Sequence, residues 1–299
     1  MKNIIEYYYN IRIDKLHNNS DIYYFNVNNN SFIFKPFIDN PDKSYDIYRL
    51  NSILGSKLNV DSIIPNKYNN PITRVNNIDY ILILNKKELK LTLPLISNMA
   101  LSNINITSLE RNNWETLWED KVDYYEMQIG ENEKKYSLMR ESFDYFVGMA
   151  ENAISYLVNT KLELKPTSVD QKVISHNNIN LSLTDPTNII LDHKSRDVAE
   201  YIKLSFWNNN KDIFKELDEY FYYNYYSIYG MRVLFSRVLY PSYYFYLYDE
   251  IISNKREEKD INKIITRISE YEIFLYNIYI YLKKYYDIPS IEWLKKTRT

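Results

Sequence analysis

Residues 143–158 read FDYFVGMAENAISYLV and give the clearest helical signal in the chain. Apolar residues recur there at intervals of three and four positions over four turns: Phe143, Phe146, Met149, Ala150, Ala153, Ile154, Leu157 and Val158. That spacing places them along one face of a helix. The stretch therefore predicts a long helix that packs inside a larger helical region.

On the N-terminal side of this stretch, the first 90 residues predict a small α+β lobe. The expected elements are strands at 22–27 and 31–37, a helix at 45–54, and strands at 72–75 and 79–84. Asparagine clusters separate the strands of each pair, and asparagine favours tight turns. Both pairs are therefore expected to be hairpins, and the rest of this lobe is also interpreted as strands.

From about Thr107 onward the apolar spacing changes from two to 3.6 residues, which is typical of helices. Helices are expected at 108–129, 143–158, 197–207, 211–226, 231–247 (interrupted or started at Pro241) and 260–285. Residues 161–190 are polar, contain two prolines and are interpreted as a loop. The predicted fold class is α+β, with a β-rich N-terminal lobe at 1–90 and a helical C-terminal lobe at 91–299.

The composition excludes several classes of function. A chain of 299 residues with 45% hydrophobic and 25% charged residues is typical of a globular protein. Its formal net charge of −2 gives no electrostatic basis for binding nucleic acid. The absence of cysteine excludes disulfides, a thiol nucleophile and cysteine-bound metal. No apolar run reaches the roughly 20 residues of a membrane span, so we expect a soluble protein.

The chain is rich in tyrosine, with 32 tyrosines against four glycines. A genome rich in A and T inflates tyrosine, asparagine, isoleucine and lysine without any functional reason. The alternative is a tyrosine-rich surface that serves cross-linking or contact with a partner. The sequence leaves both interpretations open.

The polar loop and one strand lysine invite comparison with phosphoryl transfer. In kinase-like folds a strand lysine binds the phosphates beneath a glycine-rich loop and is held by a helix glutamate. Lys35 stands near the end of the strand 31–37, where such a lysine belongs. No glycine precedes Gly55, and the helix 45–54 lacks glutamate, so Asp42 or Asp46 is the expected partner of Lys35.

The loop itself departs from an active pattern. His176 matches the histidine of an H-x-D catalytic motif, but the acid position holds Asn178, whose neutral amide cannot accept a proton. Five residues further, a metal-binding asparagine is replaced by Leu183. Asp192 remains at the later magnesium position, and one carboxylate is a poor magnesium site. We therefore predict no metal site, no cofactor and no catalytic residue.

Plain structural roles compete with these assignments. His176 and His193 are also interpretable as loop histidines that hydrogen-bond to the backbone. The acidic and basic residues Asp192, Arg196 and Asp197 are interpretable as an ion-pair and capping cluster at the start of the helix 197–207.

Several blocks resemble the spore coat protein YutH family, in order over most of the chain. The two most specific are residues 143–158 and 192–202, the latter reading DHKSRDVAEYI. Residues 114–119, 239–241 and 288–294 fit the same family, whereas the first 90 residues match only in layout. That family is similar to the CotS group of spore coat proteins and, more distantly, to aminoglycoside and choline kinases.

The resemblance implies a protein-kinase-like, two-lobed fold and a place in the endospore coat, after synthesis in the mother-cell cytoplasm. Other coat proteins are then the expected partners. Carried over to this chain, the degenerate nucleotide site comprises Lys35, His176, Asn178 and Asp192, with residual ATP binding left open. The leading hypothesis is a non-catalytic pseudokinase of coat structure or assembly. Its alternatives are an ATP-binding regulatory pseudokinase and a small-molecule phosphotransferase that uses Asp185 or Asp192 as base and metal ligand.

Overall fold

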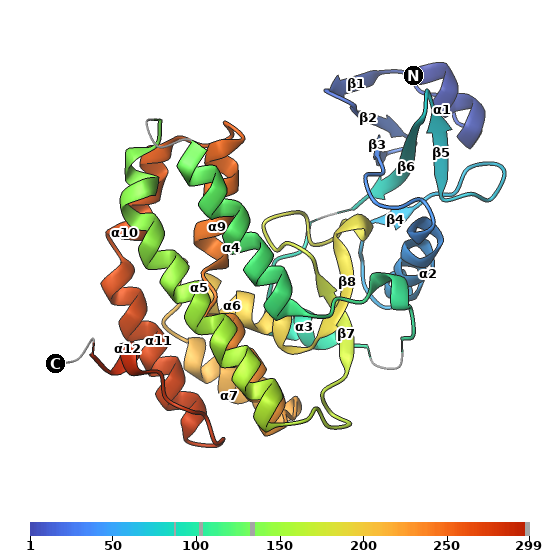
Figure 1. The fold of residues 1–299 in the computed structure, drawn as a ribbon. Coiled ribbons are helices and arrows are strands. Elements are labelled where there is room, and N and C mark those ends of the chain that lie inside the picture. Colours follow the sequence, from blue (N-terminus) through green and yellow to red (C-terminus); the bar gives the residue numbers. More distant parts are fainter. Residues whose placement is uncertain (87, 102–103, 132–134, 297–299) are drawn as a thin grey trace. The chain divides into compact units, whose positions relative to one another are not determined.

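The computed structural model describes all residues except 87, 102–103, 132–134 and 297–299 (Figure 1). The chain forms two compact units. The first combines Met1–Thr92 and Met99–Glu110 with the distant segment Val173–Asp192. The second combines Leu93–Asn98, Arg111–Lys172 and His193–Thr299. The expected lobe boundary near residue 90 stays a prediction.

The first unit is built on a six-stranded antiparallel sheet in the order β1-β2-β3-β6-β4, with β5 also pairing to β6. Its strands are β1 (Leu16–Asn19), β2 (Ile22–Val27), β3 (Asn30–Pro36), β4 (Ser62–Ile63), β5 (Ile72–Val75) and β6 (Ile78–Asn85). Strand β6 pairs with three neighbours, and its residues 80–83 are buried. A strand that is buried on both faces reads as a continuous apolar run, here YILI.

Asparagine forms the tight turns of this sheet. Asn28 and Asn29 join β2 to β3 with φ angles of 50° and 64°, and Asn76 and Asn77 join β5 to β6 with 49° and 64°. Two-residue hairpin turns need positive φ at both positions, and asparagine tolerates that region better than other residues with a side chain. Both predicted hairpins are confirmed, and asparagine takes the role that glycine has in most proteins.

A short helix, α1 (Lys2–Tyr9), packs against one face of the sheet, where only strands were expected. Its buried residues Ile5 and Tyr9 join a core with Phe25, Phe34 and other sheet residues. The helix ends at Asn10, which adopts a left-handed conformation with φ 51°. The strand interpretation of this segment was wrong because the helix faces a sheet that local sequence does not reveal.

The segment 161–190, interpreted as a loop, contains regular structure. Strands β7 (Lys172–His176) and β8 (Ile189–His193) form a separate two-stranded sheet. The short 3-10 turn η2 (Pro186–Asn188) comes directly before β8. The predicted helix at 45–54 is confirmed as α2 (Lys43–Gly55). Turn η1 (Thr107–Leu109) and η2 both lie against α2.

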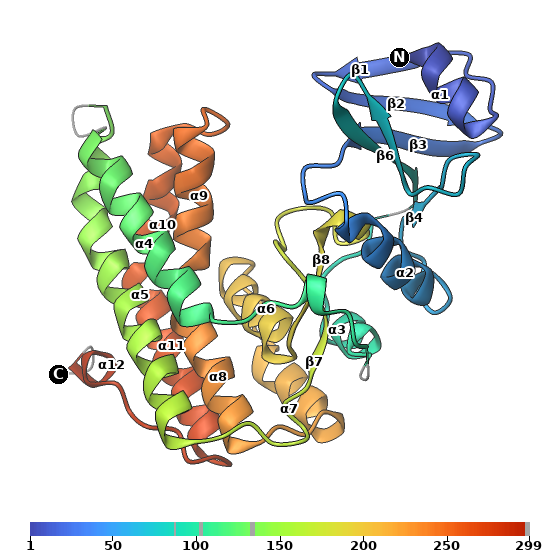
Figure 2. The same ribbon diagram turned by 45° about the vertical axis from the view of Figure 1, so that its right-hand side comes forward.

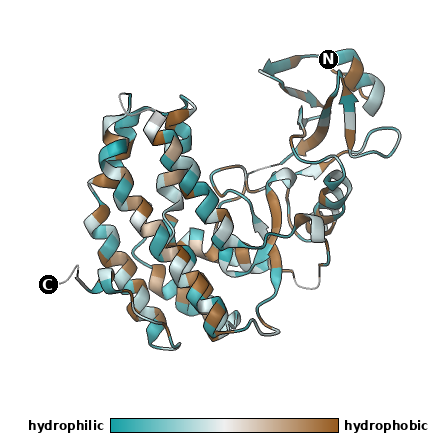
Figure 3. Cartoon of the chain, in the orientation of Figure 1, coloured by the Kyte–Doolittle hydropathy of each residue, from teal (hydrophilic) through white to brown (hydrophobic). Residues whose placement is uncertain are grey.

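The second unit is helical. Its elements are α3 (Leu93–Met99, of which Met99 belongs to the first unit), α4 (Trp114–Glu131), α5 (Ser137–Glu163), α6 (Ser195–Trp207), α7 (Ile213–Tyr223), α8 (Ile228–Leu239), α9 (Ser242–Ile252), η3 (Glu258–Ile261), α10 (Asn262–Ile265), α11 (Ile268–Lys283) and α12 (Glu292–Lys296). The long helix α5 packs against α4 and α8, and α8 also packs against α6 (Figure 2). Hydrophobic and hydrophilic residues alternate in bands along these helices (Figure 3).

The apolar stripe of residues 143–158 lies in the core as expected, since all its members except Val158 are buried. The helix expected at 108–129 begins only at Trp114, because Asn113 takes a left-handed conformation with φ 54°. Pro241 separates α8 from α9, as predicted. A sheet-based unit and a helical unit confirm the α+β class. Within the described residues no helix has the length and apolarity needed to cross a membrane.

Candidate functional site

Lys35 lies on β3, and its side chain meets the loop between β7 and β8, about 150 residues further along the chain. Its ammonium forms an ion pair with the carboxylate of Asp185 and donates a hydrogen bond of 2.9 Å to the hydroxyl of Thr187. The two charged side chains are only 18% and 22% exposed. The first unit therefore neutralises its strand lysine internally.

The carboxylate of Asp185 is itself oriented by the turn that follows it. Its Oδ1 accepts hydrogen bonds from the Thr187 amide at 2.9 Å and from the Thr187 hydroxyl at 2.8 Å, so Asp185 caps η2. The expectation that Asp42 or Asp46 pairs with Lys35 was wrong. Asp46 instead accepts a hydrogen bond from Ser108, and the loop supplies a carboxylate that reaches the strand directly.

A second carboxylate, Asp61, lies close to this ion pair and is buried. Burial raises the pKa of Asp61 above its ordinary 3.8, and the negative charge of Asp185 adds to this. Hydrogen bonds from the Lys86 amide and from Thr184, together with the Lys35 charge, act in the opposite direction. One ammonium therefore faces two carboxylates in a partly desolvated cluster, which no local sequence pattern indicated.

His176 ends β7 and is completely buried. Its Nε2 lies 3.1 Å from the carbonyl oxygen of Leu183, which is the residue that replaces the expected metal-binding asparagine. This geometry agrees with the structural interpretation of His176, a loop histidine bonded to the backbone. The buried ring therefore connects the end of β7 to the middle of the β7–β8 loop.

Asn178, at the position of the catalytic acid, is tied to Asn188 through the backbone. The Asn178 amide donates to Asn188 Oδ1 at 3.0 Å, and Asn188 Nδ2 donates to the Asn178 carbonyl at 2.9 Å. The side-chain oxygen of Asn178 accepts from the Asn180 amide at 2.9 Å. The sequence did not single out Asn188, which lies just before β8, because the spacing counted from Asn178 led to Leu183.

Asp192 and Asn188, the polar side chains on and just before β8, are enclosed within the first unit. Asp192 lies on β8 and is 1% exposed. Both ends of the Asn188 amide make hydrogen bonds within the loop, including one of 3.1 Å to the Ser182 carbonyl. Among the described residues, no cluster of three or more histidine or acidic side chains has an arrangement that could hold a metal ion.

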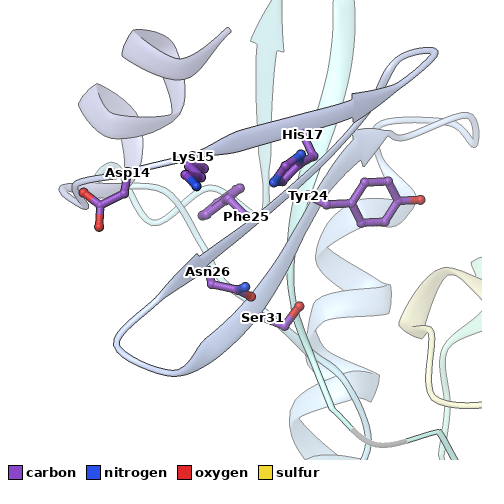
Figure 4. A pocket seen from close by; sticks show the side chains of 7 residues that line it. All are labelled: Asp14, Lys15, His17, Tyr24, Phe25, Asn26 and Ser31. Carbon is purple, nitrogen blue, oxygen red and sulfur yellow. The ribbon is translucent and has the colours of Figure 1, made fainter.

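The face of the sheet that carries Lys35 also has an open hollow of about 460 Å³ (Figure 4). It is lined by Asp14, Lys15, His17, Tyr24, Phe25, Asn26 and Ser31. Side chains alternate between the faces of a strand, and the register pairs His17 with Tyr24 and Asn26 with Ser31. Ser31 therefore faces the same side as Lys35, four residues further along β3. The core residues Phe34 and Tyr23 occupy the opposite face.

The second unit contains a buried polar cluster around Asp170. Its carboxylate accepts from Ser227 at 2.7 Å and lies 3.6 Å from Nε2 of His193, whose Nδ1 is 2.7 Å from the Ser195 hydroxyl. Burial opposes ionisation of Asp170, but the nearby His193 ring and the hydrogen bonds from Ser227 and Thr167 outweigh it and lower its pKa. Ser195 is completely buried, so its hydroxyl is shielded from solvent.

The sequence of the chain matches the family described as "Spore coat putative kinase YutH" over residues 2–278. The chain belongs to the YutH family. The endospore coat-associated protein YutH of Bacillus subtilis (strain 168) is 31% identical over 208 residues. That alignment covers 61% of this chain and 61% of the relative's length.

Solved structures extend the likeness of this YutH-family chain to phosphotransferases. An aminoglycoside phosphotransferase from Alicyclobacillus acidocaldarius superposes with a TM-score of 0.63 at 11% identity, covering 95% of this chain and 97% of the other. Spectinomycin phosphotransferase APH(9)-Ia, in complex with ADP and spectinomycin, gives 0.56 at 15% identity, with coverage of 99% and 97%. Amicoumacin kinase hAmiN gives 0.56 at 10% identity, with coverage of 98% and 95%. At such low identity the likeness shows the fold alone: a kinase-like, aminoglycoside phosphotransferase-like fold.

Proposed function

We propose that this chain is a non-catalytic, kinase-like protein of the endospore coat that acts in coat structure or assembly. The observation that carries the proposal is the ion pair between Lys35 and Asp185. Phosphoryl transfer in this fold requires the strand lysine to neutralise charge on the phosphates. In active kinases the carboxylate partner of this lysine is a helix glutamate. Here the partner is Asp185 of the β7–β8 loop, and the Thr187 hydroxyl accepts a second hydrogen bond from the same ammonium.

The loop supports the same conclusion for proton transfer. A general base must accept the proton of the attacking hydroxyl, and a neutral amide such as that of Asn178 does not do so near neutral pH. The side-chain oxygen of Asn178 is occupied by the Asn180 amide, and its backbone is fastened to Asn188. These contacts give the residue a role in shaping the loop.

The place in the coat rests on the family and on the name of the Bacillus subtilis relative. A test is a fluorescent fusion of the chain, followed through sporulation in an endospore-forming host that lacks its own copy. We expect a shell of fluorescence around the forespore and recovery of the protein in the coat extract. Fluorescence confined to the cytosol of vegetative cells would contradict the proposal.

The same assay separates a structural role from an enzymatic one. A Lys35→Met variant keeps the length of the stem but removes the charge that phosphate needs. We expect this variant to reach the coat and restore the spore phenotype as well as the unaltered chain does. Loss of rescue with normal localisation would favour the enzymatic alternative.

A second candidate function, ATP binding without transfer, is favoured by one observation. The hollow lined by His17, Tyr24 and Ser31 lies on the same sheet face as Lys35, so a ligand could occupy it while the ion pair stays closed. Thermal denaturation with ATP and magnesium tests this. Binding at about 100 times Kd stabilises the folded chain by roughly 2.7 kcal/mol. No shift at millimolar ATP removes this candidate.

A further inference from the structure

Two tyrosines that are far apart in the sequence meet on the surface of the first unit. Tyr7 lies on α1 and Tyr68 lies in the connection between β4 and β5. Their phenolic oxygens are 3.4 Å apart, although 61 positions separate the residues. Both rings are largely in solvent, with exposed fractions of 57% and 64%. A small oxidant or an enzyme can therefore reach them.

The backbone around this pair holds it in place. The amide of Lys67 donates a hydrogen bond of 2.8 Å to the carbonyl of Tyr8, which fastens the connection to the end of α1. The side-chain oxygen of Asn66 accepts from the amides of Tyr68 and Asn70 at 3.0 and 3.2 Å. Since these contacts fix the connection, the two rings start close together and lose little entropy in meeting.

A cation lies against the same two rings. The ammonium of Lys67 is 3.1 Å from the centre of the Tyr7 ring and 5.3 Å from that of Tyr68. The hydrogen bond from Tyr68, together with Lys67, lowers the pKa of Tyr7. A phenolate gives up an electron more readily than a phenol does. Tyr7 is thus the ring that we expect to be oxidised first.

We propose that Tyr7 and Tyr68 form an oxidative coupling site, at which an intramolecular dityrosine bond joins α1 to the β4–β5 connection. The reaction consumes hydrogen peroxide through a haem peroxidase. Each phenol loses one electron and one proton, and the two radicals join through the ring carbons next to their oxygens. Each coupled carbon then releases its hydrogen as the ring regains its phenol. Overall, two hydrogen atoms leave the protein and one peroxide becomes two water molecules.

The contact between the phenolic oxygens matches the product. In an ortho-coupled dityrosine both hydroxyls stand next to the new carbon–carbon bond and face each other. Two rings whose oxygens already touch therefore need only a small rotation to bring the coupling carbons together. The covalent bond would close a loop of about 60 residues, which restricts the unfolded chain.

The second unit offers a matched comparison. Tyr220 and Tyr226 have phenolic oxygens 3.3 Å apart, almost the same as in the first pair. They are 5% and 0% exposed, and burial raises the pKa of Tyr220 to about 12. We expect this pair to stay unreacted although its oxygens are in contact, because the rings are buried and offer no accessible phenolate. Comparing the two pairs therefore shows whether closeness of the oxygens is enough for coupling or whether exposure is also needed.

The test treats the folded full-length chain, at low concentration, with hydrogen peroxide and a haem peroxidase. We expect a monomer that has lost two hydrogen atoms, dityrosine fluorescence, and a cross-linked peptide containing Tyr7 and Tyr68. The Tyr68→Phe variant should lose this peptide, whereas Tyr222→Phe, which alters a tyrosine that is 82% exposed, should keep it. Retention of the intramolecular fluorescence in Tyr68→Phe, or a cross-link between Tyr220 and Tyr226 instead, overturns the proposal.

Lys67 provides a second readout that simple proximity would not change. The Lys67→Ala variant should couple with its pH dependence moved to higher pH, because the charge that favours the Tyr7 phenolate is gone. Lys67→Arg keeps a cation over the ring and should retain the original pH dependence. If both variants couple with the pH profile of the unaltered chain, Lys67 has no part in the site.

Discussion

In the first unit, the two ends of the sheet surface that carries Lys35 and Ser31 differ in structure. At the Lys35 end of β3, the ammonium bonds to Asp185 and Thr187, and the buried carboxylate of Asp61 lies close enough to interact with the charges of this ion pair. At the Ser31 end, polar side chains such as His17 and Asn26 border an open hollow. The same strand thus ends in a closed ionic cluster on one side and an accessible surface on the other. The Lys35 end is closed by an internal ion pair, whereas the Ser31 end leaves room for a ligand.

The closed end of this sheet face supports the proposal that this kinase-like chain is non-catalytic. The strand lysine is retained, yet its charge now stabilises the junction between the sheet and the β7–β8 loop. In an enzyme that charge would be directed at phosphate. We therefore propose that pairing with Asp185 gives Lys35 a structural role.

The largest expected effect comes from breaking the ion pair between Lys35 and Asp185. Asp185→Ala leaves the partly buried Lys35 ammonium without its carboxylate and removes the cap of η2. We expect a loss of about 2 kcal/mol in the free energy of unfolding, measured by urea denaturation. The control is Asp39→Ala, which breaks the more exposed ion pair with Lys43 and should cost at most about 1 kcal/mol. Equal losses in both variants would mean that the closed cluster adds no special stability.

A smaller effect concerns the dependence of stability on pH. The pKa of Asp61 is raised in the folded state, chiefly by burial, so folding holds its proton more tightly. Its contribution to stability is fully present below the ordinary pKa of 3.8 and is lost as pH rises through the raised value.

Asp61→Asn keeps the oxygen that accepts from the Lys86 amide but cannot titrate. Stability curves for the unaltered chain and for this variant should therefore diverge as the pH rises from 3.8. The unaltered chain should lose stability relative to the variant. Parallel curves would show that Asp61 does not titrate differently in the folded and unfolded states.

A still smaller effect is expected at the open end. Tyr24 is 39% exposed at the rim of the hollow, so Tyr24→Ala should change the free energy of unfolding by no more than about 0.5 kcal/mol. If ATP binds in the hollow, the same variant should reduce the thermal shift caused by ATP. A large loss of stability in Tyr24→Ala would mean that this end is part of the core.

The smallest expected effect is none at all. Asn178→Asp restores an acid at the catalytic position and keeps the oxygen that accepts from the Asn180 amide. While Asp185 holds Lys35, we expect ADP production from ATP to stay at background in this variant. The double variant Asn178→Asp/Asp185→Asn frees the lysine and serves as the comparison. Turnover in the single variant would show that only the missing base prevents catalysis.

Much of the fold follows from local patterns. The asparagine turns fix both hairpins of the sheet, and the three- and four-residue spacing fixes α5. Helix α1 was missed because it is short and its stability depends on packing against strands elsewhere. Strands β7 and β8 were missed because they are short and lie within a polar segment.

The site was less predictable, for a physical reason. Lys35 was found from its place on a strand, but its partner Asp185 is 150 positions away, and side-chain type alone does not indicate that contact. Asn188 was not singled out because its contact with Asn178 spans ten positions, which a fixed spacing of five does not indicate. The contact between Tyr7 and Tyr68 also joins residues that are far apart in the sequence, so only the folded chain reveals it.

The most direct test of the account is ADP production from ATP and magnesium by the purified chain, measured beside Lys35→Met, with and without extract from sporulating cells as a source of acceptors. Our account predicts equal background rates in both proteins under every condition. A rate above background that Lys35→Met abolishes would contradict it, because Lys35 would then be serving phosphoryl transfer.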